Sequence, residues 1–418
     1  MPDKADVAII GGGVIGVCAA HYLNAAGLSV TIIERNSIGS GCSFGNAGYV
    51  SPSHFVPLAA PGVLAKGIRW MLNPESPFYI KPRLSPELLS WVWKFRASCR
   101  EQRSSPLMPV LRDLNLASAS LFKELARTLG FDFGFEAKGL FMLFNSEKGE
   151  HEQLEAAEIS DKIGVEAKVM STTEINGLDP GLRFHARGGV FYPQDCHMDP
   201  ARFVQGMGAL VGKAGVRMLT STEVLGFETS AEKINSLRTS RGPLVADQYV
   251  LAGGSWSPVL ARELGFSIPV QPAKGYSVTF THPPRKMAIP SILTEAKVAI
   301  TPLGDRLRFA GTLELAGLDL SVNARRVRAI LNAVPRYLSD ISPADAMNIE
   351  PWAGLRPCTP DGLPLVGRSE AFRNLVVATG HAMLGLSLAP VTGKIVAEIV
   401  KGAPPSFDLA PLRPDRFN

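Results

Sequence analysis

The first 34 residues alternate between apolar runs and a glycine-rich break. Residues 5–10 form an apolar run that predicts a short buried strand, and residues 29–34 form a second run that ends in an acid. Between them, residues 17–26 have the composition of a helix, which Gly27 ends. A strand, a helix and a strand within about 30 residues are typical of a parallel βαβ unit.

The rest of the chain continues to mix helices and strands. Helices are predicted over residues 85–102, 107–129, 151–162, 199–211 and 321–338, with a last helix ending near 400. Strands are predicted at 140–144, 216–219, 223–227, 234–237, 246–251, 269–280, 298–310 and 374–378. The helix at 321–338 has a basic face that we expect to be solvated, formed by Arg325, Arg326 and Arg328. No repeat period is visible, and 418 residues are enough for about two or three domains.

Composition narrows the class of protein. Hydrophobic residues make up 46% of the chain and charged residues 19%, which argues against a disordered or highly charged chain. The net charge of +5 is spread thinly, so nucleic-acid binding is not expected. No apolar run reaches the roughly 18 residues of a spanning helix. The five cysteines are an odd number without a C-x-x-C pair, which predicts no disulfide framework, no metal site and a reducing cytoplasmic location.

The break after the first strand has the spacing G-x-G-x-x-G, formed by Gly11, Gly13 and Gly16. In a dinucleotide site the first glycine allows the tight turn, the second admits a pyrophosphate, and the third lets helix and strand pack closely. Glu34 ends the second strand 23 residues after Gly11, where an acid accepts hydrogen bonds from ribose hydroxyls and disfavours a 2′-phosphate. The motif predicts a dinucleotide site but does not choose between NAD and FAD.

Two further small-residue segments bear on that choice. Residues 39–48 form a second glycine-rich loop that could wrap an extended dinucleotide with backbone N–H groups, which favours FAD; the alternative is a flexible surface loop. Residues 252–256 follow a predicted strand and could border a nucleotide or simply pack tightly.

Arg356 lies among apolar and glycine neighbours in the segment 352–367. A buried arginine needs an anionic partner or full hydrogen bonding, and its planar fork suits a carboxylate. That carboxylate could belong to a substrate or to the nearby Asp361, and the residues alone leave both alternatives open.

These motifs together resemble those of the FAD-dependent D-amino-acid oxidase superfamily, and within it the bacterial D-amino acid dehydrogenase group. The resemblance covers nearly the full length. It depends on the N-terminal glycine motif with Glu34, residues 43–48, 59–62 and 274–277, W-x-G-x-R-P-x-T-P-D-G-x-P at 352–364, and A-T-G-H at 378–381.

The resemblance implies an α/β protein with two domains. A discontinuous, Rossmann-like FAD-binding domain would comprise residues 1–57, 196–262 and 345–418. An α+β substrate-binding domain with a mixed or antiparallel sheet would comprise residues 58–195 and 263–344. The implied FAD contacts are Gly11, Gly13, Val14, Ile15, Gly16, Glu34, Arg35, Ser43, Asn46, Ala47, Val224, Gly253, Gly380, His381, Gly385, Leu386 and Ser387.

The implied reaction is oxidative deamination of a D-amino acid, with a hydride passing from the α-carbon to flavin N5. Arg356 would bind the substrate carboxylate, and Tyr276, His381 and His54 are the other catalytic candidates. A structural role is an equal alternative for Tyr276 and His381. D-Alanine-type members have tyrosine in place of His54 and tryptophan in place of Leu386. These departures favour cyclic imino acids such as D-proline or D-hydroxyproline as substrates.

The resemblance also implies a partner for the reduced enzyme. Electrons would pass to quinone or another redox carrier, with the protein peripheral on the inner membrane. Residues 55–80, with Lys66, Arg69 and Trp70, could form the interfacial segment, although a lid or ordinary core is an alternative. Covalent attachment of flavin through Cys358 is not expected. The competing functions are a glycine or sarcosine oxidase that uses O₂ and a non-catalytic flavin- or nucleotide-binding protein.

Overall fold

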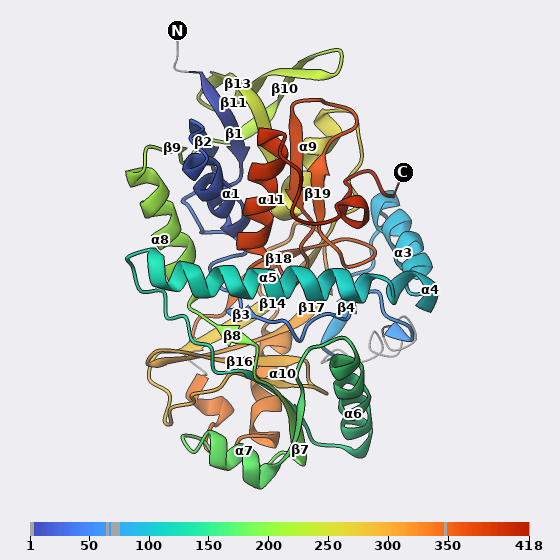
Figure 1. The fold of residues 1–418 in the computed structure, drawn as a ribbon. Helices are drawn as coiled ribbons and strands as arrows, with labels where there is room; N and C mark the ends of the chain where they lie inside the picture. Colours follow the sequence, from blue (N-terminus) through green and yellow to red (C-terminus); the bar gives the residue numbers. More distant parts are fainter. Residues whose placement is uncertain (1–3, 64–66, 68–75, 347–348, 418) are drawn as a thin grey trace.

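The computed structural model describes residues 4–63, 67, 76–346 and 349–417. Two large sheets organise these residues, one at each end of the molecule (Figure 1). The six-stranded sheet has the order β19-β20-β13-β1-β2-β9. Its strands are β1 (Ala5–Ile10), β2 (Val30–Ile33), β9 (Arg217–Leu219), β13 (Ala246–Leu251), β19 (Leu365–Arg368) and β20 (Leu375–Thr379). All neighbours are parallel except β19 with β20, and α1 (Val14–Ala25) connects β1 to β2.

The nine-stranded sheet is mixed. Its order is β18-β14-β17-β16-β15-β5-β7-β6, with β4 paired to β17. The strands are β4 (Phe78–Ile80), β5 (Leu140–Phe144), β6 (Lys168–Ser171), β7 (Gly188–Tyr192), β14 (Gln271–Phe280), β15 (Ser291–Leu293), β16 (Val298–Leu303), β17 (Arg306–Leu315) and β18 (Trp352–Cys358). Pairs β15–β5 and β17–β4 are parallel and the others antiparallel.

Smaller sheets and the helices complete the fold. β3 (Tyr49–Val50) pairs with β8 (Cys196–His197), and β10 (Val224–Ser230), β11 (Lys233–Thr239) and β12 (Gly242–Leu244) form a meander. Further α-helices with described bounds are α3 (Pro86–Ser98), α4 (Glu101–Ser104), α5 (Leu107–Thr128), α6 (Glu147–Lys162), α7 (Thr172–Leu178), α8 (Pro200–Lys213), α9 (Ser257–Glu263), α10 (Ala324–Ala333) and α11 (Ala389–Lys401). The long helix α5 crosses the middle of the molecule (Figure 1).

The predicted fold class is confirmed, because a βαβ-based parallel sheet and a separate mixed sheet are both present. The exact division into domains stays a prediction. Strand β18 falls within the range 345–418 assigned to the cofactor domain, yet it pairs with β14 in the nine-stranded sheet. Residues of β18 can therefore belong to both halves of a site between the sheets.

One surface prediction is wrong. Arg326 was expected on a solvated basic face of α10, but its side chain is buried, with 3% of its surface exposed. Its Nε lies 3.6 Å from Glu314 Oε2, and its guanidinium lies over the Tyr79 ring. An amphipathic helix that covers a sheet carrying a buried acid can turn one arginine inward, and here that acid lies on β17, an element separate from α10.

Lys66, Arg69 and Trp70 of the expected interfacial segment lie outside the described residues. Among the helices that the structure describes, none has the length and apolarity needed to cross a bilayer.

Candidate active site

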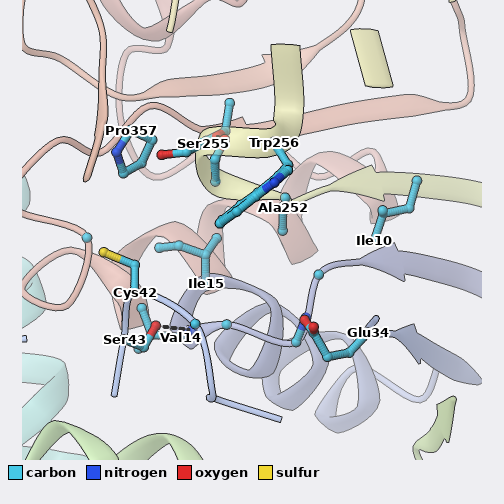
Figure 2. A pocket seen from close by; sticks show the side chains of 18 of the residues that line it. Ile10, Val14, Ile15, Glu34, Cys42, Ser43, Ala252, Ser255, Trp256 and Pro357 are labelled. Atoms are coloured by element: carbon cyan, nitrogen blue, oxygen red, sulfur yellow. Dashed lines mark hydrogen bonds between the residues drawn. The ribbon is translucent and has the colours of Figure 1, made fainter. Parts of the chain in front are cut away.

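A cleft opens at the carboxyl ends of the parallel strands of the six-stranded sheet. Ile10 at the end of β1, Ile33 at the end of β2 and Ala252 after β13 all line it. In doubly wound sheets this edge is where ligands bind, because the strand ends and the N-termini of the following helices converge there. Figure 2 shows that the side chains of Ile15 and Trp256 reach into the cleft from different elements.

The three motif glycines meet different surroundings. A Cβ on Gly11, whose φ is +113°, would lie 2.5 Å from the Ala252 carbonyl oxygen, and a Cβ on Gly16 would lie 1.9 Å from the Gly11 carbonyl oxygen. Both glycines therefore permit close backbone packing. A Cβ on Gly13 would have only Ser43 Oγ within 4 Å, at 3.6 Å, and Gly13 lines the cleft. The space beside Gly13 is thus available to a ligand.

The start of α1 and the end of β2 are joined by hydrogen bonds at the edge of the cleft. The backbone N–H of Val14 donates to Ser43 Oγ at 3.0 Å. Glu34 accepts from the backbone N–H of Gly12 at 2.8 Å and from that of Asn36 at 2.9 Å. These bonds fix the carboxylate in place, and each oxygen keeps a lone pair for a further donor such as a ribose hydroxyl.

One end of the cleft carries Trp256, which the sequence places in the segment 252–256 without a role of its own. The guanidinium carbon of Arg35 lies 4.0 Å from the centre of the Trp256 ring. Both residues line the cleft, together with Glu34 and Val224. A planar indole beside an acid with free lone pairs forms a surface on which a purine base can stack. The sequence signal was a tryptophan directly after a small-residue turn that follows a buried strand.

At the other end, Arg356 of β18 lines the cleft and is half-buried. Its Nη1 donates to the Thr312 carbonyl oxygen at 2.7 Å. Asp361, the alternative partner, forms a bidentate ion pair with Arg416 at 2.8 Å. Among the described residues no carboxylate pairs with Arg356, and burial lowers the pKa of its guanidinium. An arginine desolvated in this way can bind an anion that enters the cleft.

His381 also lines this end of the cleft. Its imidazole is 2% exposed, and its Nε2 lies 3.0 Å from Thr392 Oγ1 on α11. Burial lowers the pKa of His381 to about 3, so the ring is neutral near neutral pH. The nearby Cys42 thiol stays protonated, because burial raises its pKa. This end of the cleft therefore has one charged group, Arg356, among those named here.

The structure brings most of the predicted site residues together. Arg356 and thirteen of the predicted cofactor residues line the cleft: Gly11, Gly13, Val14, Ile15, Glu34, Arg35, Ser43, Asn46, Val224, Gly253, His381, Gly385 and Leu386. Four others do not line it: Gly16, Ala47, Gly380 and Ser387. Gly380 has a φ of +76° directly after β20, and Ser387 donates to Asn115 Oδ1 at 2.7 Å between buried side chains.

Two catalytic candidates also lie outside the cleft lining. Tyr276 is buried, and its hydroxyl donates to Glu314 Oε2 at 2.8 Å. His54 lies beside Ser53, with 3.1 Å between its Nδ1 and the serine Oγ, and burial lowers the pKa of His54 to about 4. The structure thus places both side chains in internal hydrogen bonds rather than facing Arg356 across the cleft.

The chain was compared with known proteins. A family model described as DAO, FAD dependent oxidoreductase, matches residues 6–399. The D-amino acid dehydrogenase of Granulibacter bethesdensis is 34% identical over 98% of this chain and 99% of its own. That of Methylobacterium nodulans is 36% identical over 96% of each chain.

Solved structures agree on the fold. Glycine oxidase from Geobacillus kaustophilus superposes with a TM-score of 0.81 and 26% identity over 99% of both chains. L-Proline dehydrogenase from P. horikoshii has a TM-score of 0.75 and 23% identity over 100% of this chain and 98% of its own, which supports the fold alone. Since the family model matches far more than half of the residues, the chain belongs to the FAD dependent oxidoreductase family.

Proposed function

We propose that this protein is an FAD-dependent dehydrogenase that oxidises D-amino acids at the α-carbon. The observation that carries the proposal is Arg356, which faces the dinucleotide cleft and has no carboxylate partner among the described residues. Relatives named D-amino acid dehydrogenase, at 34–36% identity over nearly the full length, support the same reaction.

The residues of the cleft fit FAD. The first-turn N–H groups of α1 and its positive dipole suit a pyrophosphate, and the space beside Gly13 leaves room for it. Glu34 would hold the ribose, with Trp256 and Arg35 beside the adenine. Residues 41–46 and the loop that contains His381 would hold the flavin ring.

When bound, FAD supplies the acceptor for the hydride that leaves the α-carbon. The protein's own residues bind and orient the substrate. Arg356 would hold the carboxylate by a two-pronged, charge-assisted hydrogen bond, which fixes the α-carbon relative to the cofactor. Leu355, Pro357 and Leu386 give this end an apolar wall that excludes water and favours the neutral amine. A dedicated base is not required, and the neutral His381 would hold the loop through Thr392.

Substrate stereochemistry and the electron acceptor test this proposal. Purified holoenzyme should reduce an artificial dye with D-amino acids, D-proline included, and at most weakly with their L-isomers. It should release little peroxide in air, because a dehydrogenase passes its electrons to a carrier. The 26% identity to a glycine oxidase motivates the competing outcome. Rapid, O₂-dependent peroxide formation from glycine or sarcosine would contradict the proposal.

We further propose that the electron acceptor is a quinone and that the protein docks at a membrane surface. We expect it on the cytoplasmic side of that membrane, because its five cysteines are free and a reducing compartment keeps thiols reduced. Leu89 and Trp93, one helical turn apart on α3, are 67% and 71% exposed, and the exposed Arg96 continues the same stripe. Leu84, which precedes α3, is also fully exposed. An exposed apolar stripe with a basic end suits the interface of an anionic bilayer.

Replacing both Leu89 and Trp93 by glutamate should weaken binding to phosphatidylglycerol vesicles by at least about tenfold, since it removes two apolar anchors and adds repulsion. Vesicle co-sedimentation measures the effect. Leu178→Glu, on α7, is the matched control, because Leu178 is another exposed apolar residue. Equal sedimentation of the double variant and the control would argue against docking through α3.

A further inference from the structure

The guanidinium of Arg356 lies directly over Gly275, on the neighbouring strand β14. A Cβ on Gly275 would lie 2.2 Å from Nη1, 2.4 Å from Nη2 and 2.5 Å from Cζ of Arg356. These are the three atoms nearest to the added Cβ, and all three belong to this one side chain. Gly275 does not have a positive φ, and the backbone there would accept alanine. Glycine is therefore needed at position 275 to leave space for the guanidinium of Arg356, and not because the backbone conformation demands it.

The second contact of the guanidinium is with a strained residue. Thr312 has a φ of +70°, and it is the β-branched one among the five non-glycine residues with positive φ in the described ranges. The other four lie in turns or bends, whereas Thr312 lies inside strand β17. Positive φ is costly for a β-branched residue, so the surrounding structure must impose it.

The strain coincides with an irregularity in the sheet. The register of β14 with β17 shifts between Lys274 and Tyr276, opposite the segment that contains Thr312. After Thr312, the N–H of Leu313 donates to the Pro77 carbonyl at 2.7 Å, where the short strand β4 begins to pair. This bulge turns the Thr312 carbonyl towards Arg356, and the carbonyl oxygen accepts a hydrogen bond from Nη1 at 2.7 Å.

We propose that Gly275 and the Thr312 carbonyl form a seat that positions the guanidinium of Arg356 for a substrate carboxylate. Gly275 sets the height of the guanidinium above β14, and the carbonyl engages one N–H, which leaves other donors for the ligand. Gly275 and Thr312 are thus positioning residues that act through Arg356. The inference rests on the proposed function, since it deepens the role given there to Arg356.

Gly275→Ala tests the seat. The added methyl group must push the guanidinium away, and a misplacement of about 1 Å can cost up to roughly 100-fold. We expect KM for the best D-amino acid to rise by roughly 10- to 100-fold while kcat changes much less. The Kd of benzoate, a carboxylate without an oxidisable α-hydrogen, should rise in parallel, as measured by perturbation of the flavin spectrum. Flavin content should stay at the wild-type level.

The double variant separates positioning from folding. With Arg356 replaced by alanine, the methyl group of Gly275→Ala no longer meets its three nearest atoms, so we expect it to add no change in KM, benzoate affinity or Tm. Gly311→Ala on β17 is the matched control, because its Cβ would face Ile330 of α10 at 3.1 Å instead of Arg356. It should leave KM unchanged.

Two results would overturn the seat. One is a normal KM in Gly275→Ala when Arg356→Ala alone raises KM. The other is the same loss of Tm or flavin from Gly275→Ala whether or not Arg356 is present, because Gly275 would then serve the fold alone. A normal KM in Arg356→Ala itself would instead overturn the proposed function, so the two failures are distinguishable.

Discussion

Arg356→Ala is expected to reduce kcat/KM for D-amino acids by roughly 30-fold to several thousandfold, mainly through KM. The substrate carboxylate would lose its charged partner inside a desolvated cleft, which costs about 2–5 kcal/mol. Arg356 has no carboxylate partner among the described residues, so its removal leaves no protein acid unpaired. Steady-state kinetics with an artificial dye measure the effect, and the flavin-to-protein ratio shows whether the cofactor site is intact.

Two companion variants make this result specific. Arg356→Lys keeps the charge but loses the planar fork, so its KM should fall between those of the wild type and the alanine variant. Arg416→Ala removes an arginine that is paired with Asp361 and is not part of the cleft lining. That variant should lower Tm without raising KM. A KM that rises equally in the Arg356 and Arg416 variants would show a general loss of structure instead of a lost carboxylate contact.

The parts of the site that the sequence predicted are local in the chain. The glycine motif and Glu34 are joined by β1, α1 and β2 within 34 residues, so spacing alone places them at one sheet edge. The bounds of β1 and β5 agree with the predicted ranges, because each is a short apolar run in a buried strand. The predicted range 298–310 instead holds β16 and the first half of β17, separated by a turn at Gly304.

What the sequence could not predict depends on contacts between distant residues. The residues alone leave open whether Arg356 pairs with Asp361, and the structure shows that this acid pairs with Arg416, 55 residues further along the chain. The positive φ of Thr312 follows from a register shift between two strands, and a threonine gives no local sign of it. The placement of Tyr276 outside the cleft likewise depends on Glu314, its partner on the neighbouring strand.

The same long-range pairing links the two halves of the site. Strand β18 pairs with β14 of the nine-stranded sheet, yet Leu355, Arg356 and Pro357 line the cleft at the edge of the six-stranded sheet. Arg356 is therefore carried by one sheet and faces the cleft at the edge of the other. We expect substitutions beside the six-stranded sheet to change flavin binding without moving Arg356, and Gly13, the N-cap of α1, provides the test.

Gly13→Val is expected to yield folded but colourless protein, with FAD affinity reduced by at least about 100-fold, or about 2.7 kcal/mol. A Cβ on Gly13 would meet no protein atom closer than Ser43 Oγ at 3.6 Å, so the apoprotein has room for the substitution. The added side chain would instead occupy the space where the pyrophosphate must approach the backbone at the start of α1. Flavin absorbance of the purified protein and FAD titration of the apoprotein measure the loss.

Two other glycines separate loss of cofactor from loss of fold. Gly16→Ala should prevent folding, because its Cβ would lie 1.9 Å from the Gly11 carbonyl oxygen, a backbone atom that cannot move away. Gly177→Ala, at the end of α7, has no atom within 4 Å of the added Cβ and should retain both Tm and flavin. If Gly13→Val keeps stoichiometric FAD, the pyrophosphate does not lie against the start of α1. Gly13 is the motif glycine with free space beside it, so a valine there must displace any ligand group that occupies this space.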